Sequence, residues 1–81
     1  MKVILVQAED LEFGRPCALH LTRDQAQALL EAGVDETLSL GRGGASLRID
    51  QATVLVRGLA AGPCLLSKRE VTAQIQAQLE D

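Results

Sequence analysis

Two short patterns in this 81-residue chain mark the starts of α-helices, and they limit the folds available to it. Thr22 lies three residues before Gln25, and Ser67 lies three residues before Glu70. In such a capping box the Thr or Ser side chain accepts a hydrogen bond from the amide three residues later, and the Gln or Glu side chain bonds back. The pattern occurs twice, so we expect two helices.

Apolar residues at helical spacing follow each capping box. They predict helices over residues 23–32 and 68–79. Leu29 and Leu30 are the largest apolar residues of the first helix, and we expect them to anchor it in the core.

The remaining apolar residues lie in short runs that are typical of strands. The first run is apolar on both faces at its centre, which favours an interior strand. Glycine-rich residues 41–44 separate two later runs and predict a hairpin. Residues 58–66 contain Gly62 and Pro63 and are predicted to be a connecting loop. The predicted strands are residues 2–8, 17–21, 38–40, 47–49 and 53–57.

The order of these elements is β-β-α-β-β-(β)-α, which predicts an α+β protein. Two helices on one face of a mainly antiparallel sheet, a two-layer sandwich, would bury both apolar stripes. A chain of this length holds one core, so residues 1–81 are predicted to form a single domain.

The large apolar side chains are almost all aliphatic. The chain has fourteen Leu and eleven Ala but one Phe, no Trp and no Tyr. Base-stacking surfaces for single-stranded nucleic acid are therefore missing. The formal charge of −3 also argues against direct binding to phosphate backbones, whereas it is compatible with a basic protein partner.

The apolar runs are too short to cross a membrane, and the sequence shows no secretory signal. We therefore predict a cytoplasmic protein that does not bind membranes. Two cysteines do not form a disulfide framework, so we predict buried, reduced thiols and no Cys17–Cys64 disulfide under reducing conditions.

Cys17, His20 and Cys64 are the only soft metal ligands. Cys17 and His20 have the spacing of a zinc half-site, but on a strand they point to opposite faces. The same geometry disfavours nucleophilic catalysis by a Cys–His pair. We predict no metal, no cofactor and no catalytic residue. Whether these three residues ever meet is left open by the pattern.

The segment from Gly41 to Gly44 resembles a phosphate-binding loop only in its glycines. It lacks the Lys and Ser or Thr of a P-loop and does not open a helix. We interpret it as a hairpin turn that presents Arg42 at its tip.

Three basic residues flank the predicted loop 58–66. Arg57 precedes it, and Lys68 and Arg69 follow it at the start of the second helix. A helix N-terminus attracts anions, so these residues form a candidate anion site.

Acidic residues concentrate in two loops. Glu9, Asp10 and Glu12 precede the second strand, and Asp35 and Glu36 follow the first helix. We expect a negative patch if the two loops are adjacent.

We interpret the chain as a small acidic non-enzymatic interaction module, an inhibitor or regulator that binds a macromolecular partner. One form of this hypothesis is a phage-type inhibitor of a nucleic-acid-handling host complex, like an anti-CRISPR protein. The partner would then have a basic or nucleic-acid-binding surface. The alternatives are a small-ligand or anion-binding domain, and a structural subunit that oligomerises, for example as a homodimer, through an edge strand. The candidate partner-binding residues are Glu9, Asp10, Glu12, Phe13, Arg15 and Arg42.

Overall fold

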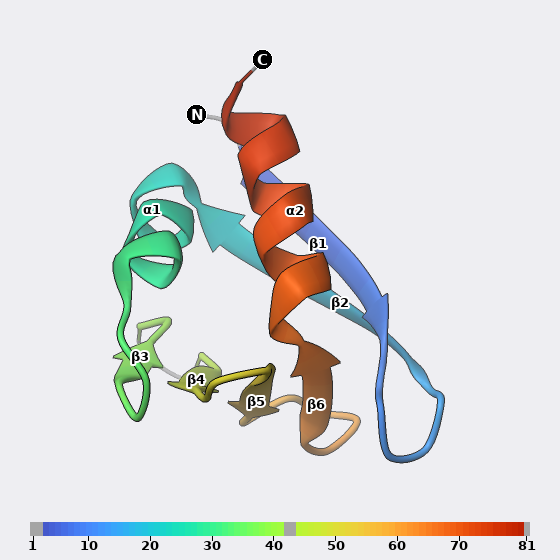
Figure 1. The fold of residues 1–81 in the computed structure, drawn as a ribbon. Helices are drawn as coiled ribbons and strands as arrows, with labels where there is room; N and C mark the ends of the chain where they lie inside the picture. Colours follow the sequence, from blue (N-terminus) through green and yellow to red (C-terminus); the bar gives the residue numbers. More distant parts are fainter. Residues whose placement is uncertain (1–2, 42–43, 81) are drawn as a thin grey trace.

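The computed structural model describes residues 3–41 and 44–80, which form six strands and two helices (Figure 1). No helix in this part of the chain is long and apolar enough to cross a membrane. The elements are β1 (Val3–Glu9), β2 (Pro16–Thr22), α1 (Arg23–Glu31), β3 (Thr37–Ser39), β4 (Ser46–Ile49), β5 (Thr53–Arg57), β6 (Cys64–Ser67) and α2 (Lys68–Leu79).

The strands form two antiparallel sheets. One sheet is the hairpin β1-β2, and the other has the order β3-β4-β5-β6. The α+β class, the antiparallel pairing and the two helices are confirmed. The placement of residues 2–8 and 53–57 in one sheet was wrong, because β1 and β5 belong to different sheets.

The four-stranded sheet is covered on one side by the two helices and the β1-β2 hairpin (Figure 1). Its strands alternate, so that every second side chain points into the core. The hairpin contributes its own inner face, through Ile4 and Val6 on β1 and Leu19 and Leu21 on β2. The apolar run of β1 suggested an interior strand, but this expectation was wrong. The outer face of β1 includes Val3, which is 56% exposed.

The first helix begins as its capping box predicts. The Thr22 hydroxyl accepts a hydrogen bond from the amide of Gln25, and the Gln25 side chain accepts one from the amide of Thr22. α1 ends at Glu31, one residue earlier than expected. Leu29 is buried in the core, whereas Leu30 is half-buried at its edge.

The predicted loop 58–66 was wrong in its last three residues, because Cys64 to Leu66 belong to β6. Cys64 and Leu66 are buried and alternate with half-buried residues, which is the pattern of a strand with one face on the core. Pro63 directly precedes this strand, and a proline can precede a strand without costing it a ladder hydrogen bond.

α2 lies against β1 and begins directly after β6 (Figure 1). Val71 and Ile75 are completely buried, so the helix is docked along its apolar stripe. Two glutamines of α2 also bond to the main chain of β1. The amide group of Gln74 bonds to the N–H and C=O of Gln7, and that of Gln78 bonds to the N–H and C=O of Leu5.

Candidate functional site

The loop that joins β1 to β2, residues 10–15, has a fixed backbone. The amide of Asp10 donates to the carbonyl of Arg15 (2.8 Å), and the amide of Gly14 donates to the carbonyl of Asp10 (2.8 Å). Gly14 adopts a φ of 71°, which a glycine tolerates without the steric cost of a side chain. The loop is thus a closed turn rather than an open connection.

The carboxylate of Asp10 attaches this loop to β6. One oxygen accepts a hydrogen bond from the Leu65 amide (2.7 Å), and the other accepts one from the Phe13 amide (2.7 Å). The Leu11 amide donates in turn to the Leu65 carbonyl (2.8 Å). The Leu65 amide, followed by the Phe13 amide and the Arg15 charge, lowers the pKa of Asp10 below its ordinary value, although desolvation opposes this.

Asp10 was predicted to contact a partner, and the structure assigns it another role. The residue is 3% exposed, and both carboxylate oxygens are bonded within the molecule. It acts as a structural staple between the loop and β6.

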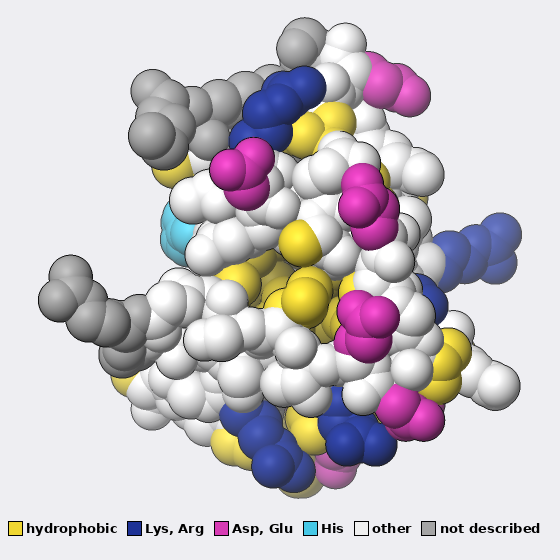
Figure 2. Space-filling view, turned by 90° about the vertical axis from the view of Figure 1, so that its left-hand side faces the viewer, with side chains coloured by type: hydrophobic (Ala, Val, Ile, Leu, Met, Phe, Trp, Pro, Cys, Tyr) yellow, Lys and Arg dark blue, Asp and Glu magenta, His cyan; other side chains and the backbone are white. Residues whose placement is uncertain are grey.

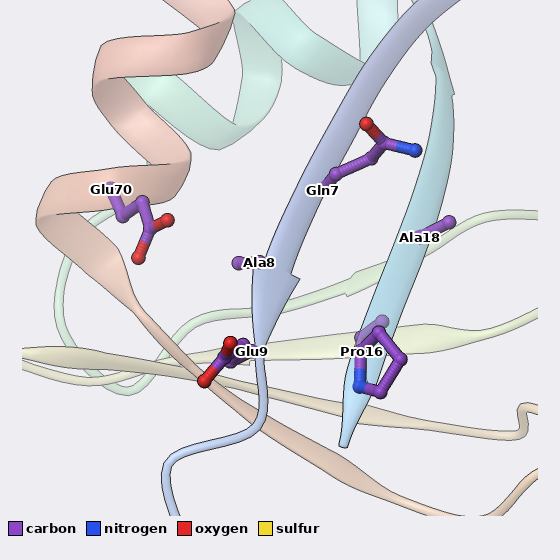
Figure 3. Close-up of a pocket in the computed structure, with 7 residues that line it drawn as sticks. Gln7, Ala8, Glu9, Pro16, Ala18 and Glu70 are labelled. Carbon is purple, nitrogen blue, oxygen red and sulfur yellow. The ribbon is translucent and has the colours of Figure 1, made fainter. Parts of the chain in front are cut away.

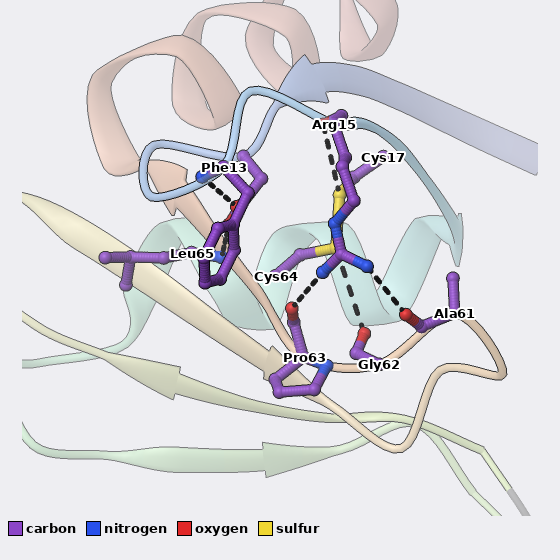
Figure 4. Close-up of a disulfide and its surroundings, with 9 residues drawn as sticks. Phe13, Arg15, Cys17, Ala61, Gly62, Pro63, Cys64 and Leu65 are labelled. Atoms are coloured by element: carbon purple, nitrogen blue, oxygen red, sulfur yellow. Dashed lines mark hydrogen bonds between the residues drawn. A yellow bond between two sulfur atoms is a disulfide. The ribbon is translucent and has the colours of Figure 1, made fainter.

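Arg15 attaches the loop to the segment that joins β5 to β6 (Figure 4). Its guanidinium donates to the carbonyls of Ala61 (2.9 Å) and Pro63 (3.2 Å). The same group lies 5.6 Å from the centre of the Phe13 ring, within the range of a cation–π contact. Arg15 is therefore engaged with two main-chain carbonyls and the Phe13 ring and does not project as a free anchor.

A disulfide between Cys17 and Cys64 joins β2 to β6 beneath this loop (Figure 4). The prediction of two reduced thiols is therefore corrected. Both residues were expected to be buried, and they are. The sequence offered no sign that residues 47 positions apart would meet. His20 points to the opposite, exposed face of β2 and does not join them.

The tip of the loop exposes two large apolar side chains. Leu11 is 55% exposed and Phe13 is 73% exposed, and together they account for two of the four exposed large apolar residues in the described chain. They are two positions apart on a backbone that Asp10, Arg15 and the disulfide hold in place. We refer to Leu11 and Phe13 as the apolar tip.

An open groove lies beside the apolar tip, between the loop and the first turn of α2. It has a volume of about 550 Å³ and is lined by Glu9, Asp10, Leu11, Gly14 and Glu70. A neighbouring pocket of about 370 Å³ lies on the hairpin and also includes Glu9 and Glu70 (Figure 3). Within residues 3–41 and 44–80, neither of these glutamates forms a salt bridge. Sequence reasoning missed Glu70 because it lies some sixty positions from the loop.

The second acidic loop does not join the first. The amide of Asp35 donates to the carbonyl of Ile49, at the β3-β4 side of the sheet, whereas the Asp10 loop bonds to β6 at the opposite edge. Asp35 also pairs with Arg48 (3.2 Å). The expected continuous patch of both loops was therefore wrong. Arg42, at the predicted hairpin tip, lies outside the described residues.

The candidate anion site is only partly assembled. Lys68 and Arg69 line a pocket of about 640 Å³ at the start of α2, but Arg57 lies at the far end of β5, opposite Ser46. Two amides of the helix N-terminus already have acceptors, because Lys68 donates to the carbonyl of Ala52 and Glu70 donates to the Ser67 hydroxyl. Little donor capacity is left for an anion.

Among residues 3–41 and 44–80, no group of three or more His, Cys, Asp or Glu side chains is arranged to hold a metal ion. Comparison with protein families, curated proteins and solved structures finds no match for this chain. Function must therefore be inferred from the geometry of the chain itself.

Proposed function

We propose that this protein is a non-enzymatic interaction module that binds a protein partner through the apolar tip, Leu11 and Phe13. The observation that carries the proposal is the exposure of both side chains on a loop whose main chain is fixed by bonds to β6 and to the β5-β6 connection. Exposed apolar residues cost solubility, so their concentration on one rigid loop favours a binding role.

The rigidity of the loop supports this role. A loop that is already ordered loses little conformational entropy on binding, so more of the contact energy appears as affinity. The Asp10 carboxylate fixes the main chain at Phe13, and the Arg15 guanidinium lies 5.6 Å from the centre of the Phe13 ring. A chain without Trp or Tyr has Phe13 as its only large aromatic anchor.

The charges around the apolar tip define the kind of partner. Glu9, Glu12 and Glu70 are exposed, and none of them forms a salt bridge with another residue in the part of the chain that the structure describes. A partner with an apolar pocket surrounded by Lys or Arg would match this arrangement. The carboxylates would mainly accelerate association, and the apolar contacts would slow dissociation.

An inhibitor or regulator is the role that suits such a module, because binding by a rigid loop can block a site on the partner without chemistry. The phage-type form of this hypothesis remains a proposal of the same kind. A cytoplasmic location also stays a prediction, and the Cys17–Cys64 bond does not favour it, since disulfides persist mainly in oxidising compartments.

The test removes the apolar tip without disturbing the loop. The wild-type protein and the Phe13→Ser variant are immobilised and incubated with lysate of the producing cells, and the captured proteins are compared by mass spectrometry. We expect a specific protein that binds wild type and is reduced at least roughly tenfold on the variant, as for loss of a central hot-spot side chain. Val34→Ser is the matched control, because Val34 is also exposed (48%) but lies elsewhere.

Charge reversal then tests the acidic surroundings with the purified partner. Glu9→Lys combined with Glu12→Lys is expected to slow association and flatten its dependence on salt. Glu80→Lys, at the end of α2, is the control. If Phe13→Ser and Val34→Ser capture the same proteins as wild type in equal amounts, the apolar tip is not the binding site.

A further inference from the structure

Three of the four sheet edges in the described chain are protected. The outer edge of β1 is occupied by the side chains of Gln74 and Gln78. The outer edge of β6 is bonded at Leu65 by the Asp10 carboxylate and the Leu11 amide. The edge of β3 is three residues long, and a very short edge strand offers little for another strand to pair with.

The fourth edge, that of β2, is seven residues long and open. In an antiparallel pair, alternate residues turn their main-chain N–H and C=O groups toward the partner strand. The main-chain N–H and C=O groups of Leu5 and Gln7 point away from β2 and toward α2, so the residues on either side of them along β1 bond to β2. By the same register, Ala18 and His20 turn their N–H and C=O groups away from β1. No bond from these groups to another element occurs in the described residues.

The side chains of β2 do not discourage pairing. Proteins commonly protect an exposed edge with charged side chains, above all lysine. β2 has the sequence Pro-Cys-Ala-Leu-His-Leu-Thr and contains no Lys, Arg, Asp or Glu. Figure 2 shows the chain's single histidine, in cyan, at the molecular surface.

We propose that the open edge of β2 pairs with the β2 edge of a second copy of this chain, antiparallel and around a two-fold axis at Leu19. In this register Ala18 of each copy lies opposite His20 of the other, and the two pairs exchange four main-chain hydrogen bonds. The result is a four-stranded sheet with the order β1-β2-β2-β1 across the two copies.

The donors along β2 select this register. Pro16 has no N–H, and the N–H of Thr22 is already bonded to the Gln25 side chain (2.9 Å). In the register that places Ala18 opposite Ala18, His20 lies opposite Pro16, which has no N–H to donate to the His20 carbonyl. In the register that places His20 opposite His20, Ala18 lies opposite Thr22, whose N–H is already bonded. All three registers use the free N–H groups of Ala18 and His20, but only the Ala18–His20 register forms two pairs that each exchange both main-chain bonds, whereas the other two form one such pair each. This self-complementarity favours a second copy over an unrelated strand.

The edge lies on β2, apart from the apolar tip, so the dimer and the proposed partner can be tested separately. Sedimentation equilibrium of the purified full chain over a wide range of concentrations measures the dimer directly. We expect wild type to dimerise reversibly, to twice the monomer mass of 8.6 kDa.

Two double variants test the register. Ala18→Lys with His20→Lys places like charges directly opposite each other in both pairs, and we expect it to weaken the dimer roughly tenfold. Ala18→Lys with His20→Glu places opposite charges in the same two pairs, and we expect the dimer to be restored. Both positions are exposed, so circular dichroism should show an unchanged fold.

Two results would overturn the proposal. The first is a wild-type protein that stays monomeric at millimolar concentration. The second is a wild-type dimer that both double variants form equally well, because the interface would then lie away from β2. Loss of the partner bound by the apolar tip has no bearing on either result.

Discussion

Asp10 shows how one side chain can take the place of a missing strand. β6 pairs with a strand, β5, on one side only, so on its other side the Leu65 amide has no strand to accept its hydrogen bond. The Asp10 carboxylate supplies the acceptor that a strand would have supplied, while the adjacent Leu11 amide supplies the donor. Buried main-chain amides without an acceptor are costly, so this staple stabilises both the sheet and the loop.

The lowered pKa of Asp10 predicts how stability depends on pH. The folded protein holds the ionised carboxylate more strongly than the unfolded chain does, so the stabilisation is present above the ordinary value of 3.8. It is lost as the pH falls below that value and through the lower folded pKa. Asp10→Asn should therefore reduce stability at neutral pH and flatten the decline below pH 3.8. Urea unfolding at a series of pH values measures both effects.

The control for this prediction is Glu12→Gln, which removes a carboxylate from the same loop. Glu12 is exposed, so its variant should follow the wild-type curve. Equal acid sensitivity of Asp10→Asn and wild type would mean that the staple does not depend on the charge of Asp10.

At the scale of elements, α2 closes the edge of β1 with side chains. Gln74 and Gln78 are one helical turn apart and point to the same side, and each primary amide offers both a donor and an acceptor, as a peptide group does. The helix thus protects a strand edge that would otherwise be open to other chains.

Removing these amides should cost stability and expose the edge. Gln74→Ala and Gln78→Ala are each expected to lower the free energy of unfolding by about 1 kcal/mol, the usual net value of intramolecular hydrogen bonds. Gln76→Ala is the matched control, since Gln76 is exposed on the same helix and its side chain has no bond to β1. Chemical denaturation measures all three. An equal loss in the control would assign the effect to the helix rather than to the edge.

Elements that carry a local signal were predictable from the sequence. The helix starts followed from Thr22 and Ser67, whose side chains cap the two helices, because a cap and its apolar stripe lie within a dozen residues. Only Thr22 and Gln25 form the complete capping box; at α2 the Ser67 hydroxyl accepts from the Glu70 amide without a reciprocal bond. The division into two sheets was not predictable, because it depends on which strands pair across long separations. Of the candidate site, Phe13 was predicted as a partner-binding residue, and the structure leaves it exposed. The role of Asp10 depends on Leu65, 55 residues away, and leaves no local pattern.

At the scale of the whole molecule, the disulfide connects the two sheets. Cys17 belongs to the hairpin and Cys64 to the four-stranded sheet, so the bond joins the two sheets within the core, close to the loop of residues 10–15 (Figure 4). A chain of this size buries a modest core, and a cross-link of this span restricts its unfolded state strongly.

Loss of this bond should be the largest single effect on stability. The cysteines are 47 positions apart, for which loop-closure entropy predicts a loss of about 4 kcal/mol. We expect reductant to lower the urea midpoint of wild type to that of Cys17→Ala combined with Cys64→Ala, and to leave the double variant unchanged. If the protein, unfolded without reductant, contained two reactive thiols, the Cys17–Cys64 disulfide would be absent and this prediction would be wrong.

The pairing of α2 with β1 also limits how the chain can change in length. Four residues of a helix advance about 6 Å, and two residues of an antiparallel strand advance about 6.8 Å, so the two repeats agree closely enough for two contacts. With each further repeat the mismatch accumulates, which prevents a helix from following a long strand in this way. A single-residue insertion between Gln74 and Gln78, or between Leu5 and Gln7, would turn one amide away from its partner. Insertions and deletions should therefore be excluded from these two short segments and tolerated better in loops that, unlike residues 10–15, make no such fixed contacts.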